Sequence, residues 1–168
     1  PEAAYSILKE YLNLYPPVSA NDFSAPLSYL LLQQSEAQLA FCGDSNEAIA
    51  HRIKNLQKQF HSFEQFCQLL KTKDMTYTRI SRIFTHLLLQ ITKDDYRLGR
   101  SLDYIPYLRI LGFRKDASRL LTILSNYASV PMISKTADAY NFLSSDAAKV
   151  FDFDIFAGEL YENTLSGI

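Results

Sequence analysis

Apolar residues recur every three to four positions along most of the chain, the spacing that places them on one face of an α-helix. The stretches with this pattern are residues 2–12, 26–34, 46–60, 79–91, 116–124 and 136–165. Only VPMIS, residues 130–134, favours an extended backbone, and one short segment does not make a sheet. The pattern predicts an all-α fold: a compact bundle of about eight to ten short helices with at most one short extended segment.

Polar residues at the ends of these stretches predict where the helices begin. Two pairs have the spacing of a capping box, Ser35 with Gln38 and Ser62 with Gln65, in which each side chain accepts the backbone N–H of the other residue. Thr92 with Asp95 starts a further short helix. The segment 104–113 is harder to assign, because Pro106 forces Ile105 towards an extended backbone. With 168 residues and no repeat, we expect a single helical domain in which residues 1–44 pack on residues 45–168.

The segment KTKDMTYTRISRIFTHLLLQITK, residues 71–93, combines an apolar face with a basic edge. Thr76 or Thr78 can cap this helix. At about 100° per residue, the side chains expected to face the core are those of Ile80, Ile83, Phe84, Leu87, Leu88 and Ile91. A second group falls together on one edge: Arg79, Arg82, His86 and Lys93. We expect no acidic residue on that edge, where like charges lie at i, i+3 and i, i+7.

The net charge of -1 conceals a strong segregation along the chain. Residues 1–50 carry one basic residue against six acidic ones, and residues 51–119 carry fourteen against six. Residues 120–168 carry two against six. A basic middle between acidic ends is typical of proteins that bind polyanions. The alternative is that the acidic ends fold back and neutralise the middle.

The basic edge is the candidate for an anion-binding surface. Lys71 and Lys73 add positive charge just before it, with only Asp74 against them. Arginine can bind phosphate through two parallel hydrogen bonds, and helix N-terminal N–H groups can assist. Tyr77 could stack on an unpaired RNA base, or its ring could simply pack beside the helix. The RNA-binding residues predicted from this region are Lys71, Lys73, Tyr77, Arg79, Arg82, His86 and Lys93.

Two further basic groups are weaker candidates. The first contains Arg97, Arg100, Arg109, Arg114, Lys115 and Arg119. Arg109 lies between Leu108 and Ile110, so we expect it to be partly buried and paired with Asp103 or Asp116. The second contains His51, Arg52, Lys54 and Lys58, which on a short helix can all be solvated.

Several kinds of chemistry lack their usual residues in this sequence. It contains no G-x-G-x-x-G, P-loop, G-x-S-x-G or H-E-x-x-H pattern, and its three histidines lack metal-ligand spacing. We therefore predict no metal site and no self-contained catalytic site. No apolar run is long enough to cross a bilayer and no signal peptide is evident, so a cytoplasmic protein with reduced Cys42 and Cys67 is expected.

Four segments together resemble the C-terminal half of the tRNA cytidine acetate ligases of bacteria. They are KTKDMTYTRISRIFTHLLLQITK, YIPYLRILGFRKDASRLL, VPMISK and DFDIFAGELY, and the resemblance covers about residues 45–162. The first segment carries the most specific pattern, K-x-K-x-x-T-x-x-R-x-x-R-x-x-x-H-x-L-L-x-I-T-K. The chain departs from the family at three places. The family often has a basic or aromatic residue at Asp74-Met75, tends to have glycine at Ala117, and tends to have arginine at Phe156. We therefore predict no binding residues in the segment DFDIFAGELY.

The resemblance implies an ATP-dependent enzyme that activates acetate as acetyl-adenylate. That enzyme then acetylates the wobble cytidine of elongator methionine tRNA. The adenylating chemistry of the family belongs to a domain with an H-x-G-H signature, which this sequence lacks. The resemblance therefore implies a C-terminal, non-catalytic, tRNA-binding domain that has no cofactor itself and follows a separate, N-terminal catalytic domain that uses ATP. The rival is a helical module that docks an acidic protein partner or that catalytic domain, and a free-standing enzyme is the weakest alternative.

Overall fold

The computed structural model describes residues 2–14 and 17–166 and is mostly helical. Within these residues, nine α-helices and four 3-10 helices are joined by a parallel sheet of two very short strands. The prediction of a helical fold with about this number of helices is confirmed, but the limit of one extended segment is wrong. Two residues per strand are too few to show the alternation that reveals a strand in a sequence. No helix of the described part is long and apolar enough to span a membrane.

The chain divides into two compact units. The first comprises residues 1–90 with residues 157–168, and the second comprises residues 91–156. Whether the chain folds as one domain, with residues 1–44 packed on the rest, stays a prediction.

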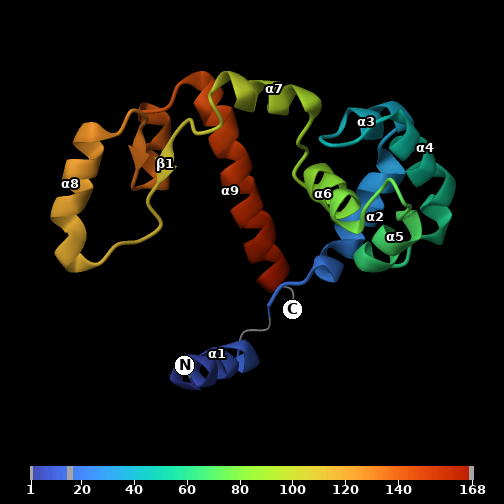
Figure 1. The fold of residues 1–168 in the computed structure, drawn as a ribbon, viewed down its shortest axis with the longest axis horizontal. Helices are drawn as coiled ribbons and strands as arrows, with labels where there is room; N and C mark the ends of the chain where they lie inside the picture. The colour runs from blue at the N-terminus through green and yellow to red at the C-terminus, as the bar shows by residue number, and fades with distance from the viewer. Residues whose placement is uncertain (1, 15–16, 167–168) are drawn as a thin grey trace. The chain divides into compact units, whose positions relative to one another are not determined.

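The first unit is built from short helices, most of which pack around one apolar core (Figure 1). Its elements are α1 (Glu2–Leu14), η1 (Ala20–Phe23), α2 (Ser24–Gln33), α3 (Glu36–Phe41), α4 (Glu47–Leu56), η2 (Gln57–Gln59), α5 (Phe63–Leu70), α6 (Tyr77–Leu88) and the second half of α9 (Ser145–Ser166). The core takes fully buried side chains from five helices: Leu31 of α2, Leu39 of α3, Ile53 of α4, Phe66 of α5 and Phe84 of α6. The rings of Phe66 and Phe84 stack with centroids 5.8 Å apart, and Phe63 meets Phe84 edge-on at 5.5 Å.

Local capping explains several of the helix boundaries. The Ser35 side chain accepts the Gln38 N–H at 3.3 Å, and the Gln38 side chain accepts the Ser35 N–H at 2.8 Å. This capping box is confirmed, and Thr92 with Asp95 also forms one where a helix was predicted to start. At Ser62 only half of the predicted box forms. Ser62 accepts the Gln65 N–H, whereas the Gln65 side chain accepts the N–H of His61.

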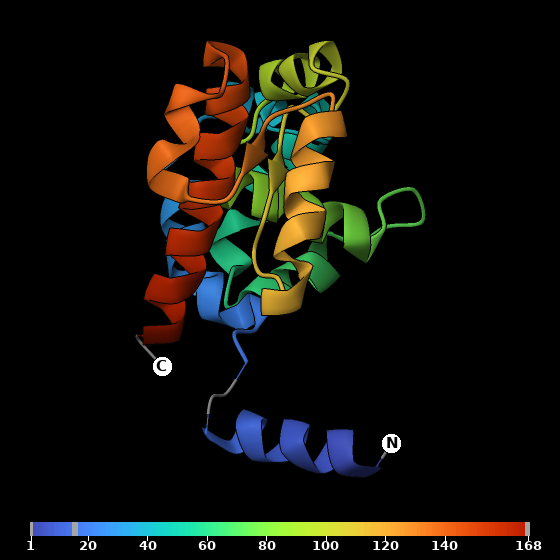
Figure 2. The ribbon, with the colours of Figure 1, turned by 90° about the vertical axis from the view of Figure 1, so that its left-hand side faces the viewer.

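The second unit has a smaller core beside the sheet. Its elements are α7 (Lys93–Ser101), β1 (Leu108–Arg109), η3 (Lys115–Ala117), α8 (Ser118–Tyr127), β2 (Met132–Ile133), η4 (Thr136–Asn141) and the first half of α9 (Ser145–Ser166). The strands pair in register Leu108 with Met132 and lie between α8 and α9 in both views (Figures 1 and 2). Phe151 of α9 is fully buried and meets the Tyr107 ring edge-on, with centroids 5.3 Å apart.

The aromatic contacts of α6 should dominate the stability of the first unit. Phe84→Ala removes a fully buried ring that contacts Phe63 and Phe66, so it should lower the free energy of unfolding by about 3–5 kcal/mol. Urea unfolding followed by circular dichroism measures this loss. The control, Thr85→Ala, changes an exposed neighbour on the same helix and should cost about 0.5 kcal/mol or less. Equal losses in the two variants would contradict this account of the core.

Cys67 should make the protein less stable at alkaline pH. Burial, and secondly the charge of Glu64, raises the pKa of the Cys67 thiol from its usual value of 9.0 to about 12. Between these values the unfolded chain loses the thiol proton while the folded chain keeps it. The free energy of unfolding should therefore fall as the pH rises above about 9, by up to about 1.4 kcal/mol per pH unit from this group.

The measurement for Cys67 is urea unfolding at about pH 8, where the thiol is protonated in both states, and at about pH 10.5, where the two states differ in protonation. Other groups also titrate there, so the informative quantity is the difference between the parent chain and Cys67→Ala. The variant lacks the thiol and should lose less stability between the two pH values. An identical loss would show that Cys67 ionises alike in both states.

Candidate functional site

α6 presents the residues that the sequence singled out, and its rotation about its axis is fixed by its apolar face. Thr76 begins the helix by accepting the Arg79 N–H at 3.3 Å. The side chains predicted to face the core within the helix are all buried: Ile80, Ile83, Phe84, Leu87 and Leu88. This burial turns Arg79, Arg82 and His86 to the other side, along one edge of the helix.

Lys93 does not belong to this edge, which corrects the prediction. α6 ends at Leu88, and Gln90 has a left-handed backbone with φ of 57°. Thr92 and Asp95 then form their capping box, so Lys93 is the first residue of α7 and belongs to the second unit. The helical wheel placed Lys93 with Arg79 because it assumed one helix from residue 79 to residue 93. The Thr92 and Asp95 pair is the signal in the sequence that marks the break.

An acidic residue does lie at the basic edge, which corrects a second prediction. Asp44 sits in the loop between α3 and α4 with a φ of 61°. Its carboxylate forms an ion pair with the Arg82 guanidinium, and its carbonyl oxygen accepts a hydrogen bond from Arg79 at 3.1 Å. A helical wheel compares only residues of one helix, so it cannot reveal an acid that reaches the edge from a distant loop. The two arginines are thus oriented by Asp44 rather than left unopposed.

Lys71 and Lys73 lie in the loop between α5 and α6, and both are exposed. Neither has an ion pair with any residue in the described part of the chain. Tyr77 is half-buried and packs against the first core, where burial raises the pKa of its hydroxyl. The Tyr77 ring therefore packs beside the helix, which was the alternative to stacking on an RNA base. We name Lys71, Lys73, Arg79, Arg82 and His86 together the α6 basic surface.

Arg52, Lys54 and Arg109, from the two weaker basic groups, bond to other parts of the protein itself. Arg52 donates to the carbonyl oxygens of Leu70 and Leu69, at 3.0 and 3.3 Å, and so satisfies the C-terminal end of α5. Lys54 donates to the Leu31 carbonyl oxygen at 2.7 Å. Arg109 is partly buried as predicted, but its partner is Asp154 at 2.8 Å rather than Asp103 or Asp116.

No group of three or more histidine, cysteine or carboxylate side chains in residues 2–14 and 17–166 could hold a metal ion. Both cysteines are free thiols in the core. Sequence reasoning missed one feature, a cavity beside the sheet of the second unit that Arg109 and Thr136 help to line.

Comparison with known proteins identifies the family. A model of the HIGH nucleotidyl transferases matches residues 1–167. The chain belongs to this family. It is 32% identical over 162 residues to the tRNA(Met) cytidine acetate ligase of Bacillus velezensis, covering 96% of this chain and 37% of that protein. It is 33% identical over 135 residues to the Bacillus subtilis protein of the same name, covering 80% of this chain and 31% of the relative.

A solved structure shares the fold. The crystal structure of Thermotoga maritima TmcAL bound with alpha-thio ATP is similar with a TM-score of 0.87 at 19% identity. The similarity covers 98% of this chain and 42% of that one. The chain thus spans roughly a third of the curated relatives and less than half of the solved protein.

The family match overturns the predicted role of the chain. A C-terminal, non-catalytic tRNA-binding domain was expected beside a missing catalytic domain, with a docking module as the rival. The nucleotidyl transferase model instead matches residues 1–167, so the chain carries that family's own domain and both readings are wrong. The expectation that this chain holds no cofactor conflicts with the same match, and a separate missing catalytic domain is not supported. The error came from giving the absence of four residues, H-x-G-H, more weight than the pattern of the whole chain.

Asp44 should control how strongly the α6 basic surface attracts polyanions. Asp44→Asn removes the charge that pairs with Arg82, so the variant should leave a heparin column at higher salt than the parent chain. The pair is partly exposed, so the free energy of unfolding should change by about 1 kcal/mol or less. Glu10→Gln makes the same change of charge on α1 and serves as the control. Equal shifts in the two variants would mean that net charge alone sets the elution.

Proposed function

We propose that the protein to which this chain belongs is an ATP-dependent tRNA(Met) cytidine acetate ligase. The observation that carries the proposal is the 32% identity, across 96% of the chain, to a curated protein of that name. The 0.87 TM-score to a relative crystallised with an ATP analogue supports ATP as the nucleotide. Acetate would be activated as acetyl-adenylate before it is transferred to the cytidine. A cytoplasmic location is part of the proposal, since the substrate is tRNA.

Within that protein, the α6 basic surface is proposed to contact the tRNA backbone. Lys71 and Lys73 offer exposed ammonium groups that have no ion pair within the described residues. Each can neutralise one phosphate of the tRNA backbone. The Arg82 side chain is 54% exposed, so its remaining N–H donors can reach a phosphate while Asp44 orients it. Lys93 is a further candidate contact on the second unit. Tyr77 contributes least to the proposal, because its ring packs against the core.

The activity is tested with the full-length protein, ATP, acetate and tRNA(Met). Acetylated cytidine in the digested tRNA, seen by mass spectrometry only when ATP and acetate are both present, is the expected product. A tRNA whose target cytidine is replaced by uridine is the matched control and should give none. Turnover of ATP without any acetylated nucleoside would refute the proposed substrate and leave the family assignment in place.

The tRNA contacts are tested by charge reversal. Lys71→Glu with Lys73→Glu should weaken tRNA binding and flatten the dependence of log Kd on log salt by about two units, one for each lost phosphate contact. Lys58→Glu together with Lys115→Glu also reverses two exposed lysines and is the control. Filter binding across a salt series measures both slopes. If the control flattens the slope as much, the contacts are not localised at Lys71 and Lys73.

A further inference from the structure

The cavity in the second unit lies beside the sheet, on the face that carries Arg109. It has a volume of about 130 Å³ and is lined by Arg109, Ile110, Leu111, Ile133, Ser134 and Thr136. One ordered water needs only about 10–15 Å³ of such space, so the cavity can hold a group of several heavy atoms. Every lining residue belongs to the second unit, so the cavity is independent of the α6 basic surface.

Arg109 is held in place on one wall of this cavity. Its Nη1 donates to the Asp154 carboxylate at 2.8 Å, and its guanidinium carbon lies 5.8 Å from the centroid of the Phe151 ring. Phe151 is fully buried, so this support is rigid. Burial, and then the charge of Asp154, raises the pKa of the adjacent Tyr107, which keeps that hydroxyl neutral. The Arg109 side chain is 31% exposed as a result of this packing.

The bond to Asp154 occupies only one of the hydrogen-bond donors of Arg109. A guanidinium carries five N–H donors and no acceptor, and the one printed bond to Asp154 engages a single nitrogen. No other acceptor in residues 2–14 or 17–166 bonds to this guanidinium. The remaining donors are therefore available to a ligand, and they stay in a fixed orientation because Asp154 and Phe151 hold the group.

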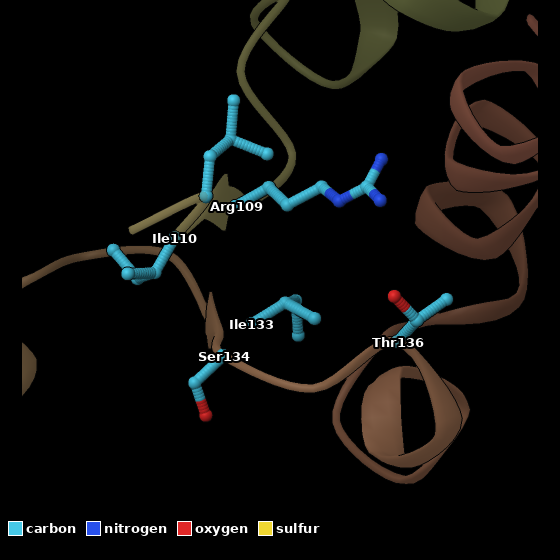
Figure 3. Close-up of a pocket in the computed structure, with 6 residues that line it drawn as sticks. Arg109, Ile110, Ile133, Ser134 and Thr136 are labelled. Carbon is cyan, nitrogen blue, oxygen red and sulfur yellow. The ribbon is translucent and has the colours of Figure 1, made fainter. Parts of the chain in front are cut away.

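A hydroxyl faces Arg109 across the cavity. In Figure 3 the Arg109 guanidinium and the Thr136 hydroxyl turn toward the same open space, and Ile133 lies between the points where they leave the backbone. The Ser134 hydroxyl and the Ile110 side chain point away from that space. Strand geometry explains the difference, because successive residues of a strand point to opposite faces. The cavity thus presents a cationic donor, a hydroxyl and an apolar floor.

We propose that this cavity binds a phosphate group, with Arg109 and Thr136 as its ligands and Asp154 as the residue that positions Arg109. Guanidinium donors form their strongest hydrogen bonds with negatively charged acceptor oxygens. A carboxylate has two oxygens in one plane, which a single guanidinium edge can satisfy. A phosphate has oxygens in tetrahedral directions, so it can bond to Arg109 and to Thr136 on the opposite wall at once. Free phosphate compounds and the phosphodiesters of RNA share this chemistry.

The test is a titration of the isotope-labelled full chain with sodium phosphate at constant ionic strength, followed by NMR. Saturable shifts confined to residues 109–111 and 133–136 are expected. Thr136→Ala should weaken binding about tenfold, the loss of one hydrogen bond to a charged group, whereas Thr136→Ser keeps the hydroxyl and should bind like the parent. Arg109→Gln should abolish the shifts. Asp154→Asn should weaken binding without abolishing it, because the carboxylate orients Arg109 and does not touch the ligand.

Several outcomes would overturn the site. Sodium chloride producing the same shifts would show a general salt effect, and unchanged binding in Thr136→Ala would remove the second ligand. The comparison of Thr136→Ala with Thr136→Ser tests the site even if Arg109→Gln unfolds the protein, because both changes are small and lie on an exposed residue. Added tRNA then distinguishes the source of the phosphate. Displacement of inorganic phosphate by tRNA assigns the site to RNA, and phosphate binding that tRNA leaves unchanged assigns it to a free phosphate compound.

Discussion

The first unit depends on the burial of one face of α6. Phe84 stacks on Phe66 of α5, and Ile80 and Ile83 fill the remaining space of the same core. A helix whose apolar face is buried cannot rotate about its axis without exposing that face to water. The contacts that stabilise the core therefore also determine which residues face outward. Arg79 and Arg82 reach one edge of α6 because Phe84 occupies the opposite side.

Contacts within a few residues could be predicted from the sequence, whereas contacts across the chain could not. The boxes at Ser35 and Thr92 follow from spacings of three residues, and the buried face of α6 follows from its periodicity. Asp44 is 38 residues from Arg82, and Asp154 is 45 residues from Arg109. Such partners depend on how loops and helices pack, which no local pattern contains. The two-residue strands fall in the same class, because each exists only through its pairing with the other.

The family assignment shows a related contrast. A four-residue signature is a local feature, and its absence from the chain led to the wrong role. Similarity that extends over 96% of the chain draws on positions throughout the sequence, including core positions that belong to no short signature. The solved structure at 19% identity shows that this fold is kept while most side chains change.

The contacts that the basic residues make within the protein limit the surfaces to which a polyanion could bind. Fourteen lie in residues 51–119, and seven of the eight arginines bond to a carbonyl, carboxylate or hydroxyl of the protein itself. Among the lysines of that region, only Lys54 does so within the described residues. The planar guanidinium suits fixed contacts, whereas the flexible, hydrated ammonium group stays in solvent. The excess of positive charge in the sequence therefore overstates the free charge, and what remains is concentrated in exposed lysines such as Lys71 and Lys73.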